Sequence, residues 1–400
     1  MALRLLTPGW LLGCGIAVAA GLTGIWASDK TIPASDKTAM AGWDFRAAAR
    51  YLDGREDWWK GWDHAKRDHG TQCVSCHTQA PYALARPALR SALGERDISD
   101  EEKAMLAGVE KRVQNWDEML PFYSDEKYGA GKERESRNAE SVLNAVILSS
   151  YDAQRGRQSE LTRLAFEHAW ELQSRSGADA GAWVWQNFSY APWESKESEY
   201  HWAALIAVAV GKEPASYAEK RSLLPAGRES APYAADPLVS PHVKALLGYL
   251  RDHYQEQPIL NKVVALWVEA YFPGTVTPQQ ERELMAELDR LQHEDGGWST
   301  SDLGDWQRRD GTPLDKRSDG YATGLIVLVR EERARGAYRL PQVARGLAWL
   351  VANQNRATGS WPAWSLNKDR KPDSDPYLFM TDAATAYAIL ALERSSVRAH

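Results

Sequence analysis

The sequence predicts an all-α protein built from stacked helix pairs. Apolar residues recur at three- and four-residue spacing along most of the 400 residues. Sustained alternation of apolar and polar residues, which is typical of strands, is missing. In addition, one short phrase of residues repeats in the loops between the helical segments. Repetition of this kind indicates helix pairs that bury their apolar faces against neighbouring pairs, because a single pair cannot do so alone.

The first 27 residues are typical of an export segment. Arg4 supplies a positive charge, and residues 10–27 form an almost wholly apolar stretch of 18 residues. That length is at the lower limit for spanning a bilayer and is long for a cleaved signal core. Cleavage after residue 27, retention as a membrane anchor and lipidation at Cys14 all remain open. Each outcome predicts a periplasmic protein or one on the outer face of the cytoplasmic membrane of a bacterium, with residues 28–41 as a linker.

Twelve segments after the linker show helical periodicity. Loops rich in Gly, Pro, Asp and Ser separate them. We expect helices over residues 43–60, 78–93, 100–118, 137–152, 159–173, 198–211, 241–254, 259–271, 278–292, 319–334, 342–353 and 381–394.

The loop between the first two predicted helices contains Cys73-Val74-Ser75-Cys76-His77. Two cysteines at this spacing with a histidine directly behind them form the attachment signature of c-type haem. Each thiol can form a thioether with a haem vinyl group, and His77 is then the proximal iron ligand. A zinc site or a redox dithiol is the alternative, but the third cysteine lies in the apolar leader and no βαβ pattern surrounds the motif. We therefore expect one covalent haem c on Cys73 and Cys76.

The second axial ligand of such a haem decides its chemistry. A methionine suits electron transfer, whereas an open face permits binding of small oxidants. Met105 and Met119 are the candidates in the following 50 residues, and Met119 precedes a proline-containing stretch. Both methionines are equally explained as core residues that fill gaps. His64 and His69, just upstream, are alternative ligands or solvated loop residues.

The repeated phrase combines Gln, Gly and Trp. It occurs as Gln173–Gly181–Trp183, as Gln292–Gly296–Trp298 and as Gln354–Gly359–Trp361. The second and third tryptophans are 63 residues apart and the first two are 115 apart, so a degenerate unit is expected over residues 212–272. The helices that follow open on Ser or Thr, which favours N-capping. The openings are Ser198, Ser318 and Thr381, and the nearby Asp319 and Asp382 are also explained by capping.

The third copy of the phrase, RGLAWLVANQNRATGSW over residues 345–361, resembles the QW repeat of squalene–hopene cyclases and related terpenoid cyclases. The resemblance covers roughly residues 100–395. It implies an α/α toroid, in which an inner ring of helices is surrounded by an outer ring around a central cavity. The aspartate-rich Asp-x-Asp-Asp motif of the cyclases is missing, and the chain is shorter than a two-domain cyclase. We therefore expect the scaffold without the cyclisation activity.

The haem motif is expected inside the first toroid repeat, over residues 42–99. Residues 45–59 form one helix, and Thr71 opens the next as its N-cap, with the haem at the start of an inner helix. Six aromatic residues that precede the motif would shield a haem. They are Trp43, Phe45, Tyr51, Trp58, Trp59 and Trp62.

These observations predict an exported monohaem c-type cytochrome with a redox or electron-transfer role on an α/α-toroid scaffold. The alternatives are a haem-dependent oxidoreductase of hydrophobic, isoprenoid-like substrates and a non-redox, cyclase-like binding scaffold. A redox partner protein and an apolar small molecule are the expected partners. The formal charge of −6 and a pI near 5.9 leave no basic footprint for nucleic acid. Contact with a membrane is expected only through the N-terminal segment.

Overall fold

A computed structural model describes residues 42–123, 129–214, 233–334, 337–372 and 374–398. Residues 42–400 cluster as one compact unit. The predicted leader (residues 1–27) and linker (residues 28–41) lie outside the described residues. Among the described helices, none combines the length and apolar character needed to cross a membrane.

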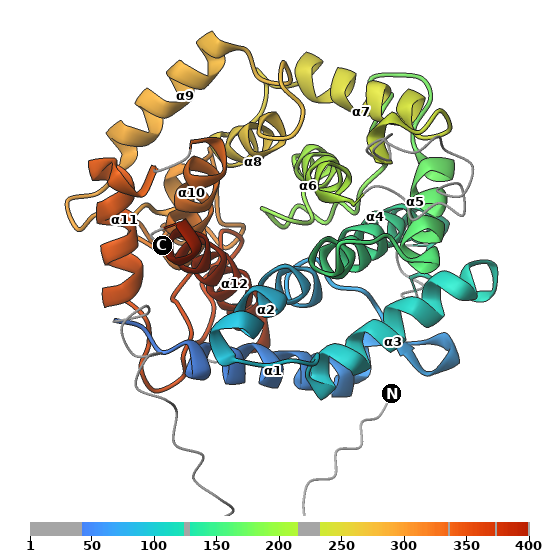
Figure 1. Ribbon diagram of the computed structural model, residues 1–400, viewed down its shortest axis with the longest axis horizontal. Helices are drawn as coiled ribbons and strands as arrows, with labels where there is room; N and C mark the ends of the chain where they lie inside the picture. The colour runs from blue at the N-terminus through green and yellow to red at the C-terminus, as the bar shows by residue number, and fades with distance from the viewer. Residues whose placement is uncertain (1–41, 124–128, 215–232, 335–336, 373, 399–400) are drawn as a thin grey trace, which may run out of the picture. The chain divides into compact units, whose positions relative to one another are not determined.

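Six helices form an inner ring (Figure 1). Each packs against the next, and the last packs against the first, so the ring is closed. Most of their side chains are buried, and α4 buries polar as well as apolar residues, among them Asn138, Glu140 and Asn144. They are α2 (Gln79–Leu93), α4 (Gly129–Arg155), α6 (Ser198–Lys212), α8 (Ile259–Glu269), α10 (Gly320–Arg333) and α12 (Asp375–Arg398).

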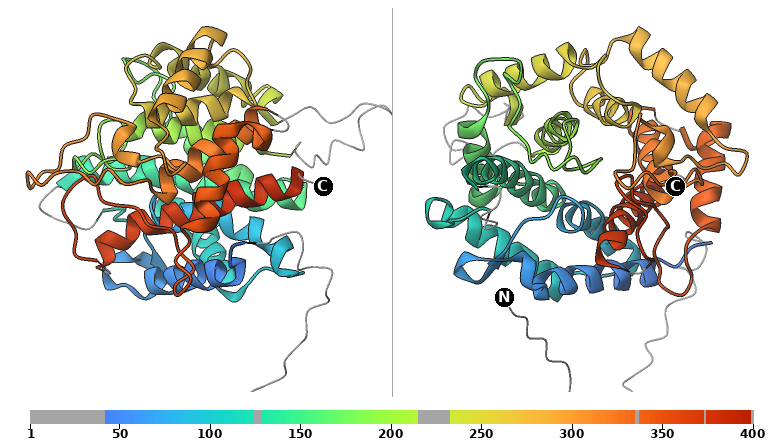
Figure 2. Two further views of the ribbon diagram at one scale, coloured as in Figure 1. Left: turned by 90° about the vertical axis from the view of Figure 1, so that its left-hand side faces the viewer. Right: turned by 180° about the vertical axis from the view of Figure 1, so that it is seen from behind.

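Six further helices surround this ring (Figure 2). α5, α7, α9 and α11 each pack against the inner helix that precedes them, while α1 packs against both α2 and α12. The predicted all-α toroid is thus confirmed, and the degenerate unit expected over residues 212–272 contains α7 and α8. The outer helices are α1 (Phe45–Gly61), α3 (Asp100–Gln114), α5 (Glu160–Leu172), α7 (Ser240–Asp252), α9 (Pro278–Leu291) and α11 (Pro341–Ala352).

Because the chain alternates between outer and inner helices, the loops that lead into the inner helices gather at one end of the ring. These loops carry the Cys-His motif and the repeated phrases. Short elements also occur there and elsewhere, including the antiparallel strands β1 (Lys66–Arg67) and β2 (Thr71–Gln72). The 3₁₀ turns are Asp63–Ala65, Asp68–Gly70, Trp116–Glu118, Tyr233–Ala235, Thr300–Asp302 and Ala337–Arg339.

The glutamine of each repeated phrase joins two neighbouring helix pairs. Gln354 Nε2 donates to the carbonyl oxygen of Gly359 in its own loop (3.0 Å) and to that of Asp44, the N-cap of α1 (2.8 Å). Gln354 Oε1 accepts from the Asp44 backbone N–H (2.6 Å). These bonds close the ring between its last and first pairs. The glutamines at positions 173 and 292 make the same two kinds of bond, to Gly181 and His242 and to Gly296 and Gln342.

The tryptophan of each phrase fastens the loop to its own outer helix. Trp361 Nε1 donates to the Leu350 carbonyl of α11 at 2.7 Å, and the ring is fully buried. The other two copies repeat this bond, from Trp183 to Ala169 and from Trp298 to Leu288. The repeated phrase therefore makes the same contacts at three places in the ring.

The expected Ser and Thr caps are wrong. Ser198 is the first residue of α6 after Glu197, and α10 is capped by Asp319, which accepts from the N–H groups of Tyr321 and Ala322. Thr381 lies inside α12, which begins six residues earlier at Asp375. A carboxylate caps a helix as well as a hydroxyl does, so the Ser-Asp pair did not fix the boundary.

The second predicted helix also begins later than expected. Thr71 lies in β2, and α2 starts at Gln79. The Cys-His motif therefore precedes the inner helix as a turn and is not part of its first turns.

A candidate cofactor site at the start of the first inner helix

The segment before the motif is held by a short hairpin. β1 and β2 pair with Lys66 opposite Gln72, and the N–H of Cys73 donates to the Ala65 carbonyl at 2.7 Å. Trp59 of α1 donates its Nε1–H to the Cys73 carbonyl at 2.9 Å. Both backbone polar groups of Cys73 are thus satisfied, and the cysteine is fixed against α1.

Ser75 shapes the turn between the two cysteines. Its Oγ accepts from the backbone N–H groups of Thr78 and Gln79, each at 3.0 Å. The first N–H groups of a helix need acceptors from outside the helix, and the side chain of the N-cap Thr78 does not accept from them. Ser75 Oγ takes this role at the start of α2. The serine in the motif is therefore structural, and it holds Cys76 and His77 directly before the inner helix.

A chain of hydrogen bonds orients His77. Its Nδ1 lies 3.0 Å from Thr78 Oγ1, and that hydroxyl donates to Asp382 Oδ2 at 2.8 Å. The opposite carboxylate oxygen of Asp382 accepts from Arg55 Nε and Tyr51 OH, both at 2.8 Å. Because the Thr78 proton is directed to Asp382, Oγ1 accepts from Nδ1–H of His77. This tautomer leaves the lone pair on Nε2.

Aromatic rings enclose the imidazole of His77. Phe379 of α12 stacks on it with ring centroids 3.8 Å apart, and Trp59 meets it edge-on at 5.2 Å. Trp193 lies further away, at 6.4 Å. Burial lowers the pKa of His77 to about 3, with the Arg55 charge acting in the same direction. The imidazole is therefore neutral throughout the physiological pH range.

Both thiols are protonated at neutral pH. Cys76 is 7% exposed and Cys73 is half-buried. Burial raises the pKa of both thiols, and the nearby carboxylate of Glu194 raises that of Cys76 further. Reactive dithiols depend on a lowered pKa. The alternative of a redox dithiol is therefore disfavoured.

Glu194 reaches this region from the loop before α6. Backbone bonds between Tyr190 and Glu194 in both directions form a tight turn. Burial raises the pKa of Glu194 to about 7, and the charge of Lys132 opposes this shift. The carboxyl group beside the cysteines is consequently close to half protonated at neutral pH.

The two candidate methionine ligands occupy different surroundings. Met119 is buried with Trp116 and Phe122, and its Sδ lies 3.8 Å from Arg112 Nη1. Met105 is buried in α3. Their role as ligands stays a prediction. His64 and His69 are exposed in the loop before the motif, where His69 lies beside Asp68 and Glu118.

The sequence indicated only part of this site. Tyr51, Trp58, Trp59 and Trp62 do gather near the motif, whereas Trp43 packs against Trp361 instead. One residue that sequence reasoning missed, Thr78, directly follows the motif. The others come from the loop before α6 and from α12. They are Trp193, Glu194, Phe379 and Asp382. Asp382 was expected to cap a helix, but α12 begins before it and its carboxylate faces Arg55.

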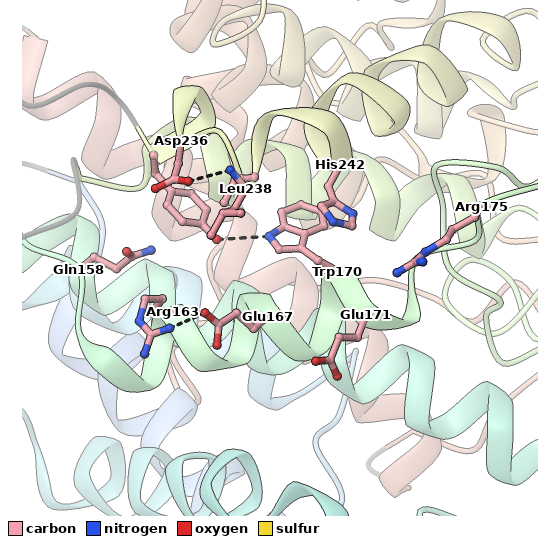
Figure 3. Close-up of a pocket in the computed structure, with 11 residues that line it drawn as sticks. Gln158, Arg163, Glu167, Trp170, Glu171, Arg175, Asp236, Leu238 and His242 are labelled. Atoms are coloured by element: carbon pink, nitrogen blue, oxygen red, sulfur yellow. Dashed lines mark hydrogen bonds and ion pairs between the residues drawn. The ribbon is translucent and has the colours of Figure 1, made fainter. Parts of the chain in front are cut away.

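A different hollow, of about 340 Å³, lies between α5 and α7 on the outer ring (Figure 3). Trp170 Nε1 donates to the Tyr233 hydroxyl there, and Arg163 pairs with Glu167. This hollow contains none of the predicted site residues. Across the described ranges, no group of three or more His, Cys, Asp or Glu side chains is placed to hold a metal ion.

Comparisons with known proteins identify similar folds only. No family model matches the chain, and no curated protein matches it. A solved structure described as a glycosidase variant is 12% identical, with 88% of this chain and 98% of that chain covered and a TM-score of 0.45. A structure described as a possible member of the GH105 family, from Klebsiella pneumoniae, is 11% identical. The match covers 95% of this chain and 100% of that chain, with a TM-score of 0.44.

These findings correct the function predicted from the sequence. One of these two structures is described as a glycosidase variant and the other as a possible member of the GH105 family, and neither is described as a cytochrome or a terpenoid cyclase. The prediction of a c-type cytochrome with an electron-transfer role is therefore wrong. The two alternatives, an oxidoreductase of isoprenoid-like substrates and a cyclase-like scaffold, are no better supported. The physical reason is that a toroid hosts unrelated chemistries, so its repeat pattern carries no activity. Covalent attachment of haem is a separate question that these comparisons do not test.

Proposed function

We propose that Cys73, Cys76 and His77 are an attachment site for one covalently bound haem. This proposal concerns the cofactor and assigns it no electron-carrier role. The observation that carries it is the hydrogen-bond chain from His77 through Thr78 to Asp382, which ties Nδ1 and leaves Nε2 as the free donor atom. Histidines that bind metals are oriented in this way, with the second nitrogen held by a partner that leads to a carboxylate.

The residues around the motif fit such a group. A ligating imidazole must be neutral, and burial keeps His77 neutral. Phe379 and Trp59 pack around the imidazole and lower the local dielectric constant. When bound, haem supplies an iron atom to Nε2 and two vinyl groups to the thiols. Thr78 and Asp382 hold the proton on Nδ1. Burial raises the pKa of Asp382, and the charge and hydrogen bond of Arg55 oppose this shift.

The proposal requires export of the chain. Haem c is attached outside the cytoplasm in bacteria, so the leader and the motif support each other. We propose that residues 42–400 lie in the periplasm or on the outer face of the cytoplasmic membrane. A redox partner protein is not part of the proposal.

We assign an architectural role only to the repeated residues that resemble those of terpenoid cyclases. Gln354, Gly359 and Trp361 tie helix pairs together, and this function needs no substrate. We propose that the phrase was retained for ring closure in a protein that does not cyclise polyenes.

The test is the intact mass of protein exported in a host that expresses the haem c maturation proteins. The wild-type chain should gain the mass of one haem, and the haem should resist acid–acetone extraction. Cys73→Ala and Cys76→Ala should each lower the fraction of chains that carry a stably attached haem. Lys66→Ala is the matched control, because Lys66 is exposed near the motif, and its haem content should equal that of the wild type. A wild-type chain of unmodified mass would overturn the proposal.

A further inference from the structure

The inner ring encloses a cavity of about 350 Å³ at the end opposite the Cys-His motif. All six inner helices line it, through Leu84, Val146, Leu205, Trp267, Leu328 and Leu390. In α2 the lining residues run from position 84 to position 91, towards the C-terminal end of the helix. The volume is within the range of small-molecule sites, which are typically about 300–1,000 Å³.

The cavity changes character from its interior to its mouth. The lining is largely aliphatic, with one aromatic ring from Trp267 and four uncharged polar side chains, which are Ser91, Ser149, Ser150 and Gln154. The charged lining residues lie near the C-terminal ends of their helices. Lys212 is the last residue of α6, Glu332 is the last but one of α10, and Glu393 and Arg394 lie in the final turns of α12. A ligand of this cavity therefore needs an apolar body and a polar head at the mouth.

Two of the four charged groups already satisfy each other. Arg394 Nη2 lies 2.8 Å from Glu332 Oε2. Glu393 differs, because it is 9% exposed and its Oε1 has no hydrogen-bond partner among the described residues. An unpartnered buried acceptor is costly, by about 1–3 kcal/mol, and such an atom in a cavity wall is explained by a ligand that donates to it.

Lys212 faces the same space. Its Nζ lies 4.5 Å from the centroid of the Trp267 ring. Burial lowers the pKa of Lys212 to about 8 and raises that of Glu393 to about 7. Both groups are thus poorly solvated, and a pKa of about 8 leaves Lys212 mostly charged at neutral pH. Besides Glu393 Oε1, the Trp267 Nε1 and Arg394 Nε atoms of the lining have no hydrogen-bond partner among the described residues.

We propose that this cavity binds a small molecule with an aliphatic body and an uncharged hydroxyl head. A hydroxyl can both donate and accept, so it would suit a lining that holds the unpartnered Glu393 Oε1 and the Lys212 ammonium. A carboxylate head would face Glu393 and Glu332, and an ammonium head would face Lys212 and Arg394. The site is distinct from the motif at the other end of the ring, so it does not depend on the proposed haem.

The test is isothermal titration of the full-length protein with 1-hexanol, 1-heptanol and 1-octanol. Each added methylene that is buried should tighten binding about fourfold. Sodium octanoate and octylamine at pH 7.5 should bind at least about tenfold more weakly than 1-octanol. Failure of 1-octanol to give saturable binding would overturn the proposal, and so would equally tight binding of octanoate or octylamine.

Variants separate the head from the body. Glu393→Leu should weaken 1-octanol binding about tenfold, because one hydrogen bond to a buried carboxyl group is lost, whereas Glu393→Gln retains an acceptor and should stay within about threefold. Unchanged binding to Glu393→Leu would overturn the assignment of the hydroxyl head.

The aliphatic wall is tested by filling it. Val208→Phe should abolish binding, and Ala209→Leu serves the same purpose should the larger side chain unfold the protein. Circular dichroism checks the fold of each variant. Leu340→Ser, at a surface residue that is 46% exposed, is the matched control and should bind normally. Retained binding in both filled variants would contradict the site. Binding should also persist in Cys76→Ala, which makes failure of this inference distinguishable from failure of haem attachment.

Discussion

Gln354 and Asp44 are 310 residues apart in the chain, yet their amide and backbone groups exchange two hydrogen bonds. The Oε1 of Gln354 accepts from the Asp44 N–H, and its Nε2 donates to the Asp44 carbonyl. Asp44 in turn caps α1, because its carboxylate accepts from the Ala47 N–H at 2.8 Å. One glutamine thus connects the loop after α11 to the first turn of α1.

Removing this glutamine should destabilise the ring. Gln354→Ala deletes three hydrogen bonds and removes the partner of the Asp44 N–H and of the Gly359 carbonyl, whereas the Asp44 carbonyl keeps its bond from the Ala48 N–H. We expect the free energy of unfolding, measured with urea, to fall by about 2–4 kcal/mol. Gln279→Ala is the matched control on the exposed face of α9 and should change it by less than about 0.5 kcal/mol. Equal effects of the two substitutions would contradict a role for Gln354 in closure.

Gly359 should not tolerate even alanine. Its φ is +85°, and a Cβ there would lie 2.1 Å from the backbone carbon of Ala47 in α1. Gly177 has the same φ but open space around it, so the two sites differ only in contact. We expect Gly177→Ala to cost about 1 kcal/mol of stability from the backbone conformation alone. Gly359→Ala should cost at least about 3 kcal/mol, or prevent folding. Similar thermal unfolding midpoints for the two variants would refute the close approach.

Thr78 should control the tautomer of His77. Thr78→Val preserves the shape but removes the hydroxyl between Nδ1 and Asp382. In ¹⁵N NMR of the haem-free protein, the wild type should show the proton on Nδ1, and this preference should disappear in Thr78→Val. Thr78→Ser restores the hydroxyl and should restore the Nδ1 signal. If the tautomer is the same in all three proteins, the hydroxyl does not orient the imidazole.

Glu56 should make the stability fall as the pH rises. Burial raises its pKa to about 8, and its Oε2 has no hydrogen-bond partner among the described residues. The folded state therefore keeps a proton that the unfolded state loses near pH 4.5, so the free energy of unfolding decreases between about pH 4.5 and 8.

Glu56→Gln should remove this part of the pH dependence. The variant and the wild type should be similar in stability near pH 4.5, and the variant should be more stable by about 3–4 kcal/mol at pH 8. Urea unfolding at a series of pH values measures the difference, with Glu294→Gln as an exposed control. A difference that is constant with pH would count against the buried, protonated carboxyl group.

Much of the architecture could be predicted from the sequence, because local periodicity determines helices. All twelve expected segments are helical, and the spacing of the tryptophans located the degenerate pair. The start of α12 could not be predicted from Thr381, although Asp375-Pro376 is itself a helix-start signal, since proline is favoured in the first turn. The apolar periodicity simply fades there.

The site was less predictable because its contacts are long-range. Cys73, Cys76 and His77 are adjacent in sequence, and their pattern alone indicated a site. Asp382 and Phe379 reach His77 only because the ring closes, and no local pattern encodes that contact. The biological role was predicted wrongly for the same reason, since it depends on the surroundings of the motif and on what enters them.

The position of α12 also implies an order of events during biosynthesis. Ribosomes make the amino-terminal pair first, but the ring of Phe379 and the carboxylate of Asp382 are synthesised some 300 residues after His77. Until that last helix docks, the imidazole lacks its stacking partner and Thr78 lacks its carboxylate acceptor. If haem is attached to the cysteines as we propose, attachment and ring closure would compete in time, and a delay in docking would lengthen the period available for attachment.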